Sequence, residues 1–312
     1  MKEEKLDACI CTHNPNLETL RLVVEALAAQ EGAPPFGVIV VDNASSPAVG
    51  AEALGALSRS GVRTRIVREE TLGIAAARAC AIRETRANWI LFVDDDNVLR
   101  SDYLRNGFDF AERHPNVGCF GGKLLLPDSL RPPGWAFPFL PYLGIKDAGE
   151  EELSGCKDEW APWEPPTAGA WVRRDVLEAY ETRIAELGRA TALGRKGRRG
   201  LGSCEDSLMM RGAARLGLSS AYVPSLVLFH YLNPHRLKLG YLLRLMRAYG
   251  PSHVALERAL NGDVATPRYY ADPVEFRKML WWVFKSEAKR SLPFAVAQVL
   301  YHFAARAAHL QG

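Results

Sequence analysis

The stretch WILFVDDDNVL, residues 89–99, places three consecutive carboxylates directly after a run that is apolar enough for a buried strand. Neighbouring carboxylates repel one another, and burying them unpaired is costly. Either bulk water or a bound cation must offset that cost. The stretch therefore indicates a strand that ends in an exposed acidic turn or in a cation site.

Strand and helix patterns alternate over the first half of the chain. The strand-like runs lie at residues 6–14, 36–46, 62–70 and 89–99. A helical pattern follows each run, and Ser101 is expected to cap the fourth helix. This alternation predicts an α/β fold with a mainly parallel, doubly wound sheet flanked by helices.

Polar residues end three of these four runs. They are Thr12, His13 and Asn14 in the first, Asp42 and Asn43 in the second, and Asp94, Asp95 and Asp96 in the fourth. Ligands of doubly wound sheets bind beyond the carboxyl ends of the strands. We therefore expect a site at this rim.

Bulk composition favours an ordinary enzyme-sized protein. The 312 residues carry 39 basic and 36 acidic side chains, a balance that gives no reason to expect a nucleic-acid partner. The six cysteines form no CxxC pair, which favours a reducing compartment. The charged N-terminus indicates no secretory signal, and no apolar run is long enough to span a bilayer. The expectation is a cytoplasmic protein.

The C-terminal region qualifies this expectation. From Arg236 onward the pattern is helical and amphipathic, with basic residues beside Trp281 and Trp282. Such helices can lie on the inner face of an anionic membrane, pack on the rest of the chain or form a homodimer.

The acidic triplet alone leaves several alternatives open. An EF-hand loop lacks its glycine and its distal glutamate at the required offsets. A haloacid-dehalogenase-type phosphatase fits better, because Asp94-x-Asp96-x-Val98 satisfies its nucleophile motif. A solvated acidic turn fits as well.

Four motifs together resemble family 2 glycosyltransferases in order and spacing. They are ACICTHNPNLETLRLVVEAL (8–27), VIVVDNASS (38–46), GIAAARACAIRETRANWILFVDDDN (73–97) and CEDSLMMRGAARLG (204–217). The resemblance covers about residues 6–235. It implies a GT-A fold and transfer of a sugar from a nucleotide diphosphate with inversion at the anomeric carbon. The implied domains are a catalytic domain over 1–235, with a nucleotide-binding half to about 122 and an acceptor half from about 123, and a helical region over 236–312.

The acidic triplet matches the DxD motif of that family. By resemblance Asp96 binds Mn²⁺ or Mg²⁺, Asp94 takes part and faces the ribose, and His230 completes the metal shell. Hard carboxylate oxygens suit both ions, and a neutral imidazole suits Mn²⁺ better. The cation would offset the repulsion within the triplet. For His230 the alternative is an ordinary core histidine.

The remaining donor contacts follow from the same resemblance. Asp42 matches a residue that accepts a hydrogen bond from uracil, with an Asx turn formed by Asp42 and Asn43 as the alternative. Thr12, His13 and Asn14 match the loop at the base. Gly73 and Arg78 match the element at the diphosphate, where Ala79 replaces a customary asparagine and a surface role for Arg78 is the alternative.

Glu205 and Asp206 match the acidic pair that supplies the catalytic base. Asp206 would remove the acceptor's proton and Glu205 would orient it, although an acidic helix N-terminus alone would explain the pair. Two further features each have a functional and a structural interpretation. The basic loop with Arg189, Arg195, Lys196, Arg198 and Arg199 could close over the donor or be solvated, and Trp160, Trp163 and Trp171 could stack on the acceptor or fill the core.

The sequence therefore predicts a metal-dependent inverting glycosyltransferase. The expected donor is a UDP-linked sugar, and the expected acceptor is a hydroxyl of a glycan, a lipid-linked saccharide or a small molecule. The alternatives are the phosphatase, which would use Asp94 as nucleophile, and a nucleotide-sugar-binding protein without turnover.

Overall fold

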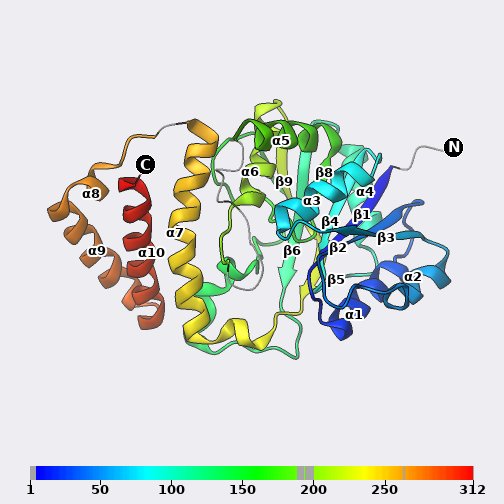
Figure 1. Cartoon of the computed structure of the whole chain (residues 1–312), viewed down its shortest axis with the longest axis horizontal. Helices are drawn as coiled ribbons and strands as arrows, with labels where there is room; N and C mark the ends of the chain where they lie inside the picture. Colours follow the sequence, from blue (N-terminus) through cyan, green and yellow to red (C-terminus); the bar gives the residue numbers. More distant parts are fainter. Residues whose placement is uncertain (1–4, 188–192, 194–199, 263, 312) are drawn as a thin grey trace. The chain divides into compact units, whose positions relative to one another are not determined.

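The computed structural model describes residues 5–187, 193, 200–262 and 264–311, and the chain divides into two compact units (Figure 1). Unit 1 comprises Met1–Pro127, Ile145–Glu186 and Met209–Tyr231. Unit 2 comprises Asp128–Gly144, Leu187–Leu208 and Leu232–Gly312. Residues 128–144 and 187–208 thus group with the C-terminal helices. The division into a nucleotide half and an acceptor half stays a prediction.

Unit 1 is built on a nine-stranded sheet (Figure 1). Its strands are β1 Leu6–Thr12, β2 Gly37–Asn43, β3 Arg63–Glu69, β4 Trp89–Asp94, β5 Asn97–Leu99, β6 Val117–Leu125, β7 Leu153–Gly155, β8 Trp171–Arg173 and β9 Ser219–His230. They lie in the order β3-β2-β1-β4-β8-β6-β9-β5, and β7 pairs with β9. The first four strands in this order are parallel, as expected, whereas β8 runs antiparallel to both β4 and β6.

The strand order reverses beside β1. The chain moves outward from β1 to β2 and β3, then returns to place β4 on the other side of β1. This reversal is the topological switch point of a doubly wound sheet, beyond whose carboxyl end ligands bind. β1 and β4 bring the first polar strand end and the acidic triplet to that point.

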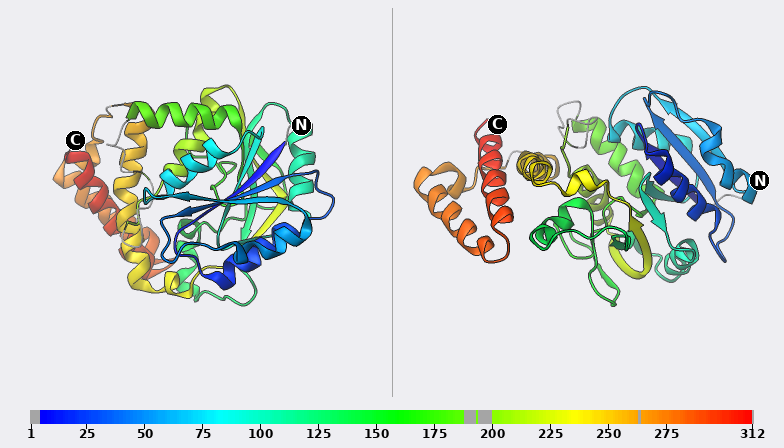
Figure 2. Two further views of the ribbon diagram at one scale, coloured as in Figure 1. Left: turned by 45° about the vertical axis from the view of Figure 1, so that its right-hand side comes forward. Right: turned by 90° about the horizontal axis from the view of Figure 1, so that it is seen from below.

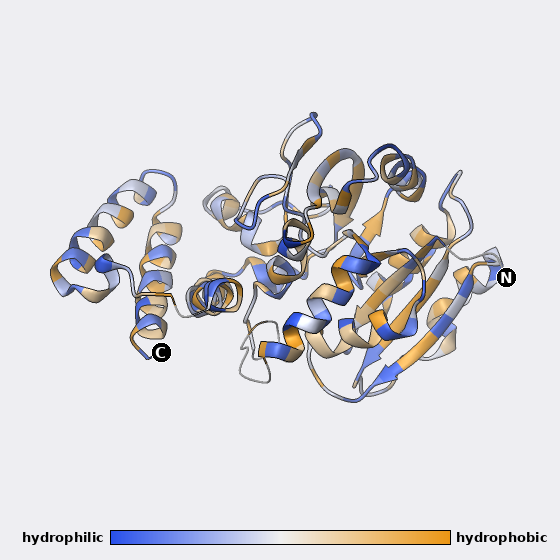
Figure 3. Ribbon diagram, turned by 90° about the horizontal axis from the view of Figure 1, so that it is seen from above, coloured by the Kyte–Doolittle hydropathy of each residue, from blue (hydrophilic) through white to orange (hydrophobic). Residues whose placement is uncertain are grey.

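Helices cover the sheet of unit 1, whose strands are largely hydrophobic (Figure 3). They are α1 Leu17–Ala28, α2 Gly55–Ser60, α3 Ile74–Glu84, α4 Tyr103–Arg113, α5 Arg174–Leu187 and α6 Glu205–Arg215, the last extending from unit 2 into unit 1. α1 begins where Asn16 caps the amides of Glu18 and Thr19, and it buries a stripe at helical spacing (Leu20, Val23, Val24 and Leu27).

The start of α4 differs from the expectation. The N-cap is Asp102 and not Ser101, and its side chain caps no amide. The Asp102 carboxylate instead accepts hydrogen bonds from the Arg100 guanidinium at 2.6 and 2.9 Å. A charge-assisted pair is stronger than a neutral cap, so the pair takes the carboxylate away from the helix end.

Trp171 is a core residue of unit 1. Its side chain is fully buried among Phe108, Phe120 and Trp89, with ring centroids 5.1, 5.5 and 6.4 Å away. Gly107 makes room for it, because a Cβ there would lie 2.3 Å from the indole ring. Of the two roles considered for Trp171, the structure supports packing and not stacking on an acceptor.

Unit 2 is helical. It contains η2 Gly134–Leu143, η4 Pro234–Leu237, α7 Leu239–Asn261, α8 Arg268–Ala271, α9 Pro273–Ala288 and α10 Leu292–Leu310. α7 and α10 lie side by side (Figure 2), and Gly250 allows the close approach, since a Cβ there would lie 2.4 Å from the Tyr301 carbonyl. The expected C-terminal helices are thus present. Over the described residues, no helix has the length and apolar character needed to cross a membrane.

Candidate active site

The polar ends of β1 and β4 meet at the switch point. Cys11 lies opposite Asp94 in the parallel register, so the residues that follow each of them are neighbours. The Thr12 hydroxyl donates a short hydrogen bond to the carboxylate of Asp95. The sheet therefore joins the first-strand loop to the acidic triplet, as the sequence predicts.

Asp96 and His230 are brought together by the pairing of the short strand β5 with the end of β9. β5 follows the triplet directly and pairs antiparallel with β9, which places Asn97 opposite His230. The Asp96 carbonyl accepts a hydrogen bond from the Tyr231 amide at 2.7 Å. The His230 Nε2 then lies 3.3 Å from Oδ2 of Asp96. Two residues that are distant in the sequence thus form one N/O donor pair.

The carboxylate of Asp96 and the imidazole of His230 are spaced as two ligands of a six-coordinate cation such as Mn²⁺ or Mg²⁺ would be. Two neighbouring ligands of such an ion lie at right angles at about 2.1 Å, which puts them about 3 Å from each other. Imidazole and carboxylate are ligands that Mn²⁺ accepts. His230 is buried, and its Nδ1 has no hydrogen-bond partner among the described residues.

The described residues bring two of the expected metal ligands together. In the part of the chain that the structure describes, no three His, Cys, Asp or Glu side chains gather closely enough to hold a metal ion. Of the expected ligands Asp94, Asp96 and His230, Asp96 and His230 therefore lie together, and Asp94 does not complete a group of three with them among the described residues. A cation that is bound through one or two protein ligands relies on water and substrate phosphates for the rest.

The carboxylates of the triplet repel one another. Burial, and then the charge of Asp96, raise the pKa of Asp95 to about 7, although the Thr12 hydrogen bond opposes the shift. Burial likewise raises the pKa of the neighbouring Cys11 to about 12, with Arg78 opposing and Asp94 adding to the shift. A cation at this place would remove the repulsion.

Asp42 is held by hydrogen bonds within its own loop and from β3. The residue is 1 % exposed, and its carboxylate accepts hydrogen bonds from the amides of Ser45 and Val49 at 3.1 and 3.0 Å. Arg68 Nη1 adds a third at 2.7 Å. Burial alone would raise the pKa of Asp42, but the hydrogen bonds, that of Ser45 first, hold it below its usual value. These contacts form the expected turn, and because a carboxylate can accept about four hydrogen bonds they leave room for a further donor, so the contact with a base stays a prediction.

Replacing Asp42 with asparagine should lower the free energy of unfolding by about 1–3 kcal/mol, because an amide cannot serve all three donors. Since folding lowers the pKa of Asp42, this contribution is complete above the unfolded value of about 4 and is lost as the pH falls below it. Urea unfolding of both proteins at pH 7 and pH 3 measures this. A difference that stayed constant with pH, or a selective loss of uridine-nucleotide binding at unchanged stability, would contradict the structural role.

Asn43, His13 and Asn14 link the loops around the rim. The Asn43 amide donates to the carbonyls of Glu69 and Thr71 and accepts from the Gly73 amide at 2.8 Å. His13 lies between Asn14 Nδ2 at 3.0 Å and the Asn43 carbonyl at 2.7 Å, which implies a proton on Nδ1. These side chains fix the loop conformations, and their contact with a nucleotide stays a prediction.

Gly73 precedes helix α3 as its N-cap, and Arg78 lies within that helix. Gly73 has φ 142°, a conformation that favours glycine, and it precedes the first residue of the helix. Arg78 is buried, which rules out the surface role, and its Nη2 donates to the Thr167 hydroxyl at 2.5 Å. A buried guanidinium near the triplet is suited to binding a diphosphate.

Glu205 and Asp206 form the first turn of α6. Glu205 is buried, and Asp206 is partly exposed with Oδ1 accepting from the Ser207 amide at 3.0 Å. Cys204 before them has φ 70°, a conformation that a non-glycine residue holds at a cost. Both acids belong to unit 2 and the triplet to unit 1, so the catalytic role of Asp206 stays a prediction.

The basic residues of the loop before α6 lie outside the described residues. They are Arg189, Arg195, Lys196, Arg198 and Arg199.

Two site residues escape the sequence analysis. Asn97 is fully buried and donates to Oδ1 of Asp96 at 3.2 Å, while its own Oδ1 has no partner among the described residues. Its signal is a polar residue within the apolar run after the triplet. Arg68 neutralises Asp42 from β3, and its signal is an arginine near the end of the third strand, beside Asp42 in a parallel register.

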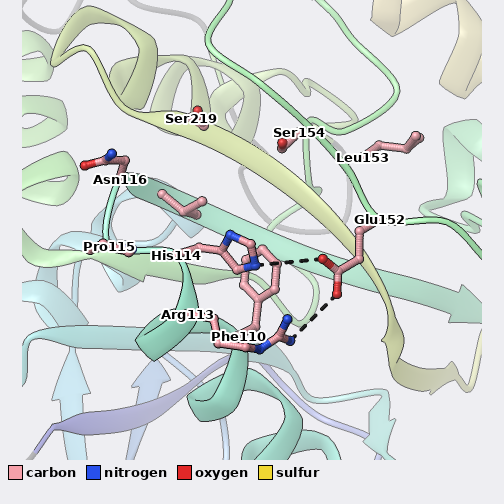
Figure 4. A pocket seen from close by; sticks show the side chains of 10 residues that line it. Phe110, Arg113, His114, Pro115, Asn116, Glu152, Leu153, Ser154 and Ser219 are labelled. Carbon is pink, nitrogen blue, oxygen red and sulfur yellow. Dashed lines mark ion pairs between the residues drawn. The ribbon is translucent and has the colours of Figure 1, made fainter.

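A separate pocket of about 250 Å³ lies at the opposite edge of the sheet, where β6 and β9 begin (Figure 4). Arg113 and His114 point toward Glu152 there, at 3.8 and 3.9 Å. The amino ends of the strands bound this pocket, so it is not part of the rim that carries the triplet.

The fold and the rim define a doubly wound α/β protein with a candidate metal site at its switch point. The sequence model of glycosyl transferase family 2 matches residues 7–179, more than half of the chain. The chain therefore belongs to glycosyl transferase family 2. The resemblance seen in its motifs is confirmed.

Two curated proteins match shorter parts of the chain. An N-acetylglucosaminyltransferase of Azorhizobium caulinodans is 32% identical over 122 residues, which are 39% of this chain and 30% of that protein. The uncharacterized protein y4gI of Sinorhizobium fredii is 32% identical over 130 residues, which are 41% of this chain and 14% of that protein. The chain thus matches less than a third of the length of each relative.

Solved structures share the fold over nearly the whole chain. TarS 1–349 of S. aureus in complex with UDP has a TM-score of 0.52 at 15% identity, and the match covers 98% of this chain and 90% of that chain. The mannosyltransferase PcManGT of Pyrobaculum calidifontis in complex with GDP-Man and Mn²⁺ has a TM-score of 0.55 at 18% identity, covering 99% and 88%. The predicted GT-A fold is confirmed.

Proposed function

We propose that this protein is a metal-dependent inverting glycosyltransferase that uses a UDP-linked sugar. The observation that carries the proposal is the pairing of Asp96 with His230 at the carboxyl edge of the sheet, 3.3 Å apart and beside the switch point. Membership of the family and the Mn²⁺ complex of a mannosyltransferase with the same fold support it.

Asp96 and His230 would hold the cation, with Asp94 as the further candidate. When bound, the cation supplies positive charge that stabilises the diphosphate as it leaves. Arg78 contributes a second positive charge from α3, and its hydrogen bond to Thr167 fixes its direction. Thr12 positions Asp95 through its hydroxyl.

Asp206 would act as the base. It accepts the proton of the acceptor hydroxyl while the oxygen of that hydroxyl forms a bond to the anomeric carbon. The bond from that carbon to the diphosphate breaks on the opposite face, so the configuration inverts. Glu205 would orient the acceptor or Asp206. The acceptor is a glycan, a lipid-linked saccharide or a small molecule with a free hydroxyl, as the sequence predicts.

Thermal unfolding in the presence of UDP, GDP or dTDP, each with and without Mn²⁺, tests the donor and the metal together. At a ligand concentration near 100 times the Kd, binding adds about 2.7 kcal/mol, which for a chain of this length corresponds to a rise in Tm of about 4 °C. We expect this rise for UDP with Mn²⁺ and a much smaller one for UDP alone. A preference for GDP or dTDP would overturn the choice of base, and shifts that ignore Mn²⁺ would overturn the metal dependence.

Nothing in the fold favours the phosphatase alternative, because the chain belongs to a different family. The alternative of a binding protein without turnover makes a separate prediction. Such a protein would show the thermal shift with UDP and Mn²⁺ but would neither transfer the sugar nor hydrolyse the donor.

A further inference from the structure

The outward face of α9 combines exposed tryptophans with basic residues. Trp281 and Trp282 are 63% and 66% exposed, and Val274 on the same helix is 57% exposed. The opposite face, with Phe276 and Val283, packs inside unit 2. Tryptophan is seldom left in water at this level, so two adjacent exposed indoles call for something that covers them.

Basic side chains surround the indoles. Arg277, Lys278 and Lys285 lie on α9, and Lys289 and Arg290 follow it directly. Lys285 lies over the Trp281 ring with its Nζ 4.7 Å from the centroid. Lys278 and Arg290 pair with Glu275 and Glu287, whereas Arg277, Lys285 and Lys289 have no carboxylate partner within the described part of the chain.

We propose that this α9 face, formed by Val274, Arg277, Lys278, Trp281, Trp282 and Lys285, docks on an anionic lipid bilayer. The inference is independent of the chemistry proposed above. A membrane interface accepts both kinds of side chain at once, because indoles settle at the level of the headgroups while ammonium and guanidinium groups reach the lipid phosphates. The proposed contact is one of the α9 side chains with the headgroup region of the bilayer.

A second copy of the chain is the competing occupant. Covering the α9 face with protein would bury the unpaired charges of Arg277 and Lys285 among indoles, which is unfavourable without matching carboxylates. α10 carries a different exposed row, Leu292, Val296, Phe303 and Leu310, which has no charge and would suit a helix partner better. The α9 face therefore favours lipid.

Cosedimentation of the full chain with vesicles tests the proposal. We expect binding to vesicles of phosphatidylcholine with phosphatidylglycerol, and at least tenfold weaker binding to phosphatidylcholine alone, since each basic residue near an anionic surface contributes about fivefold. Binding should also weaken as salt rises. Trp281→Ala/Trp282→Ala and Lys278→Glu/Lys285→Glu should each lower binding at least tenfold at unchanged Tm.

Trp160→Ala is the matched control. Trp160 is 72% exposed but stands after Asp158 and Glu159, so its loss should leave vesicle binding unchanged. Wild-type protein that ignores anionic vesicles would overturn the proposal, as would equal losses in Trp160→Ala and in the double variants. Sedimentation equilibrium tests the competing occupant. A dimer that Trp281→Ala/Trp282→Ala dissociates would assign the face to a second copy and overturn the lipid contact.

Discussion

Asp96→Asn should lower kcat/KM for sugar transfer about 10³-fold and remove the stabilisation by UDP that depends on Mn²⁺. Asp96 provides the carboxylate of the donor pair, and its Oδ2 lies 3.3 Å from His230 Nε2. An amide of the same shape carries no charge, so the variant would lose the attraction for the cation and with it several kcal/mol of charge stabilisation in the transition state. Steady-state kinetics over a range of Mn²⁺ concentrations measure both losses.

His230→Gln provides a second test of the metal site, and Asp109→Asn is the control. His230 holds the second donor atom, so its replacement should weaken Mn²⁺ binding by about 10–100-fold, and added Mn²⁺ should restore part of the rate. Asp109 lies on the exposed face of α4 in the same unit. Asp109→Asn also removes one carboxylate, but away from the proposed site, so this variant should behave as wild type. An Asp96→Asn enzyme that kept its Mn²⁺ response would show that the metal is held elsewhere.

Asp206→Asn should lower kcat about 10²–10⁴-fold, the usual contribution of a general base. The change keeps the shape of the side chain and the start of α6, where Oδ1 accepts from the Ser207 amide. The residues that we propose to bind the donor lie in unit 1, so the Kd for UDP with Mn²⁺ should change little. Rapid-quench or steady-state transfer assays with calorimetry of UDP binding separate the two effects.

Three outcomes would contradict the catalytic role of Asp206. A loss of less than tenfold, or a parallel loss of UDP binding, would assign Asp206 to helix capping or folding instead. A wild-type protein that binds UDP and Mn²⁺ but never turns over would support the binding-protein alternative.

The alternation of patterns was sufficient to predict the first half of the sheet. Apolar runs that end in polar residues place β1, β2 and β4 correctly, because the carboxyl ends of parallel strands share one edge. The strand-to-helix pattern around Trp171 also predicts β8 and the helix after it. The antiparallel direction of β8 could not be foreseen, because its pairing with β4 and β6 depends on tertiary packing.

Residue type alone does not decide which partners the carboxylates of the site contact. Asp42 and Asp96 both follow apolar strands, yet Asp42 turns to the amides of its own loop and to Arg68, whereas Asp96 meets His230. The difference depends on partners from other strands, which local sequence does not specify. The resemblance to the family named His230, but the short pairing of β5 with β9 is what brings it to Asp96.

A crystal grown with Mn²⁺ and UDP, measured at the manganese absorption edge, examines the central claim at atomic level. We expect one anomalous peak about 2–2.4 Å from the Asp96 carboxylate and from His230 Nε2, with the diphosphate oxygens completing its coordination. Bound UDP with no peak at this pair, or with manganese at a different group of residues, would contradict the account.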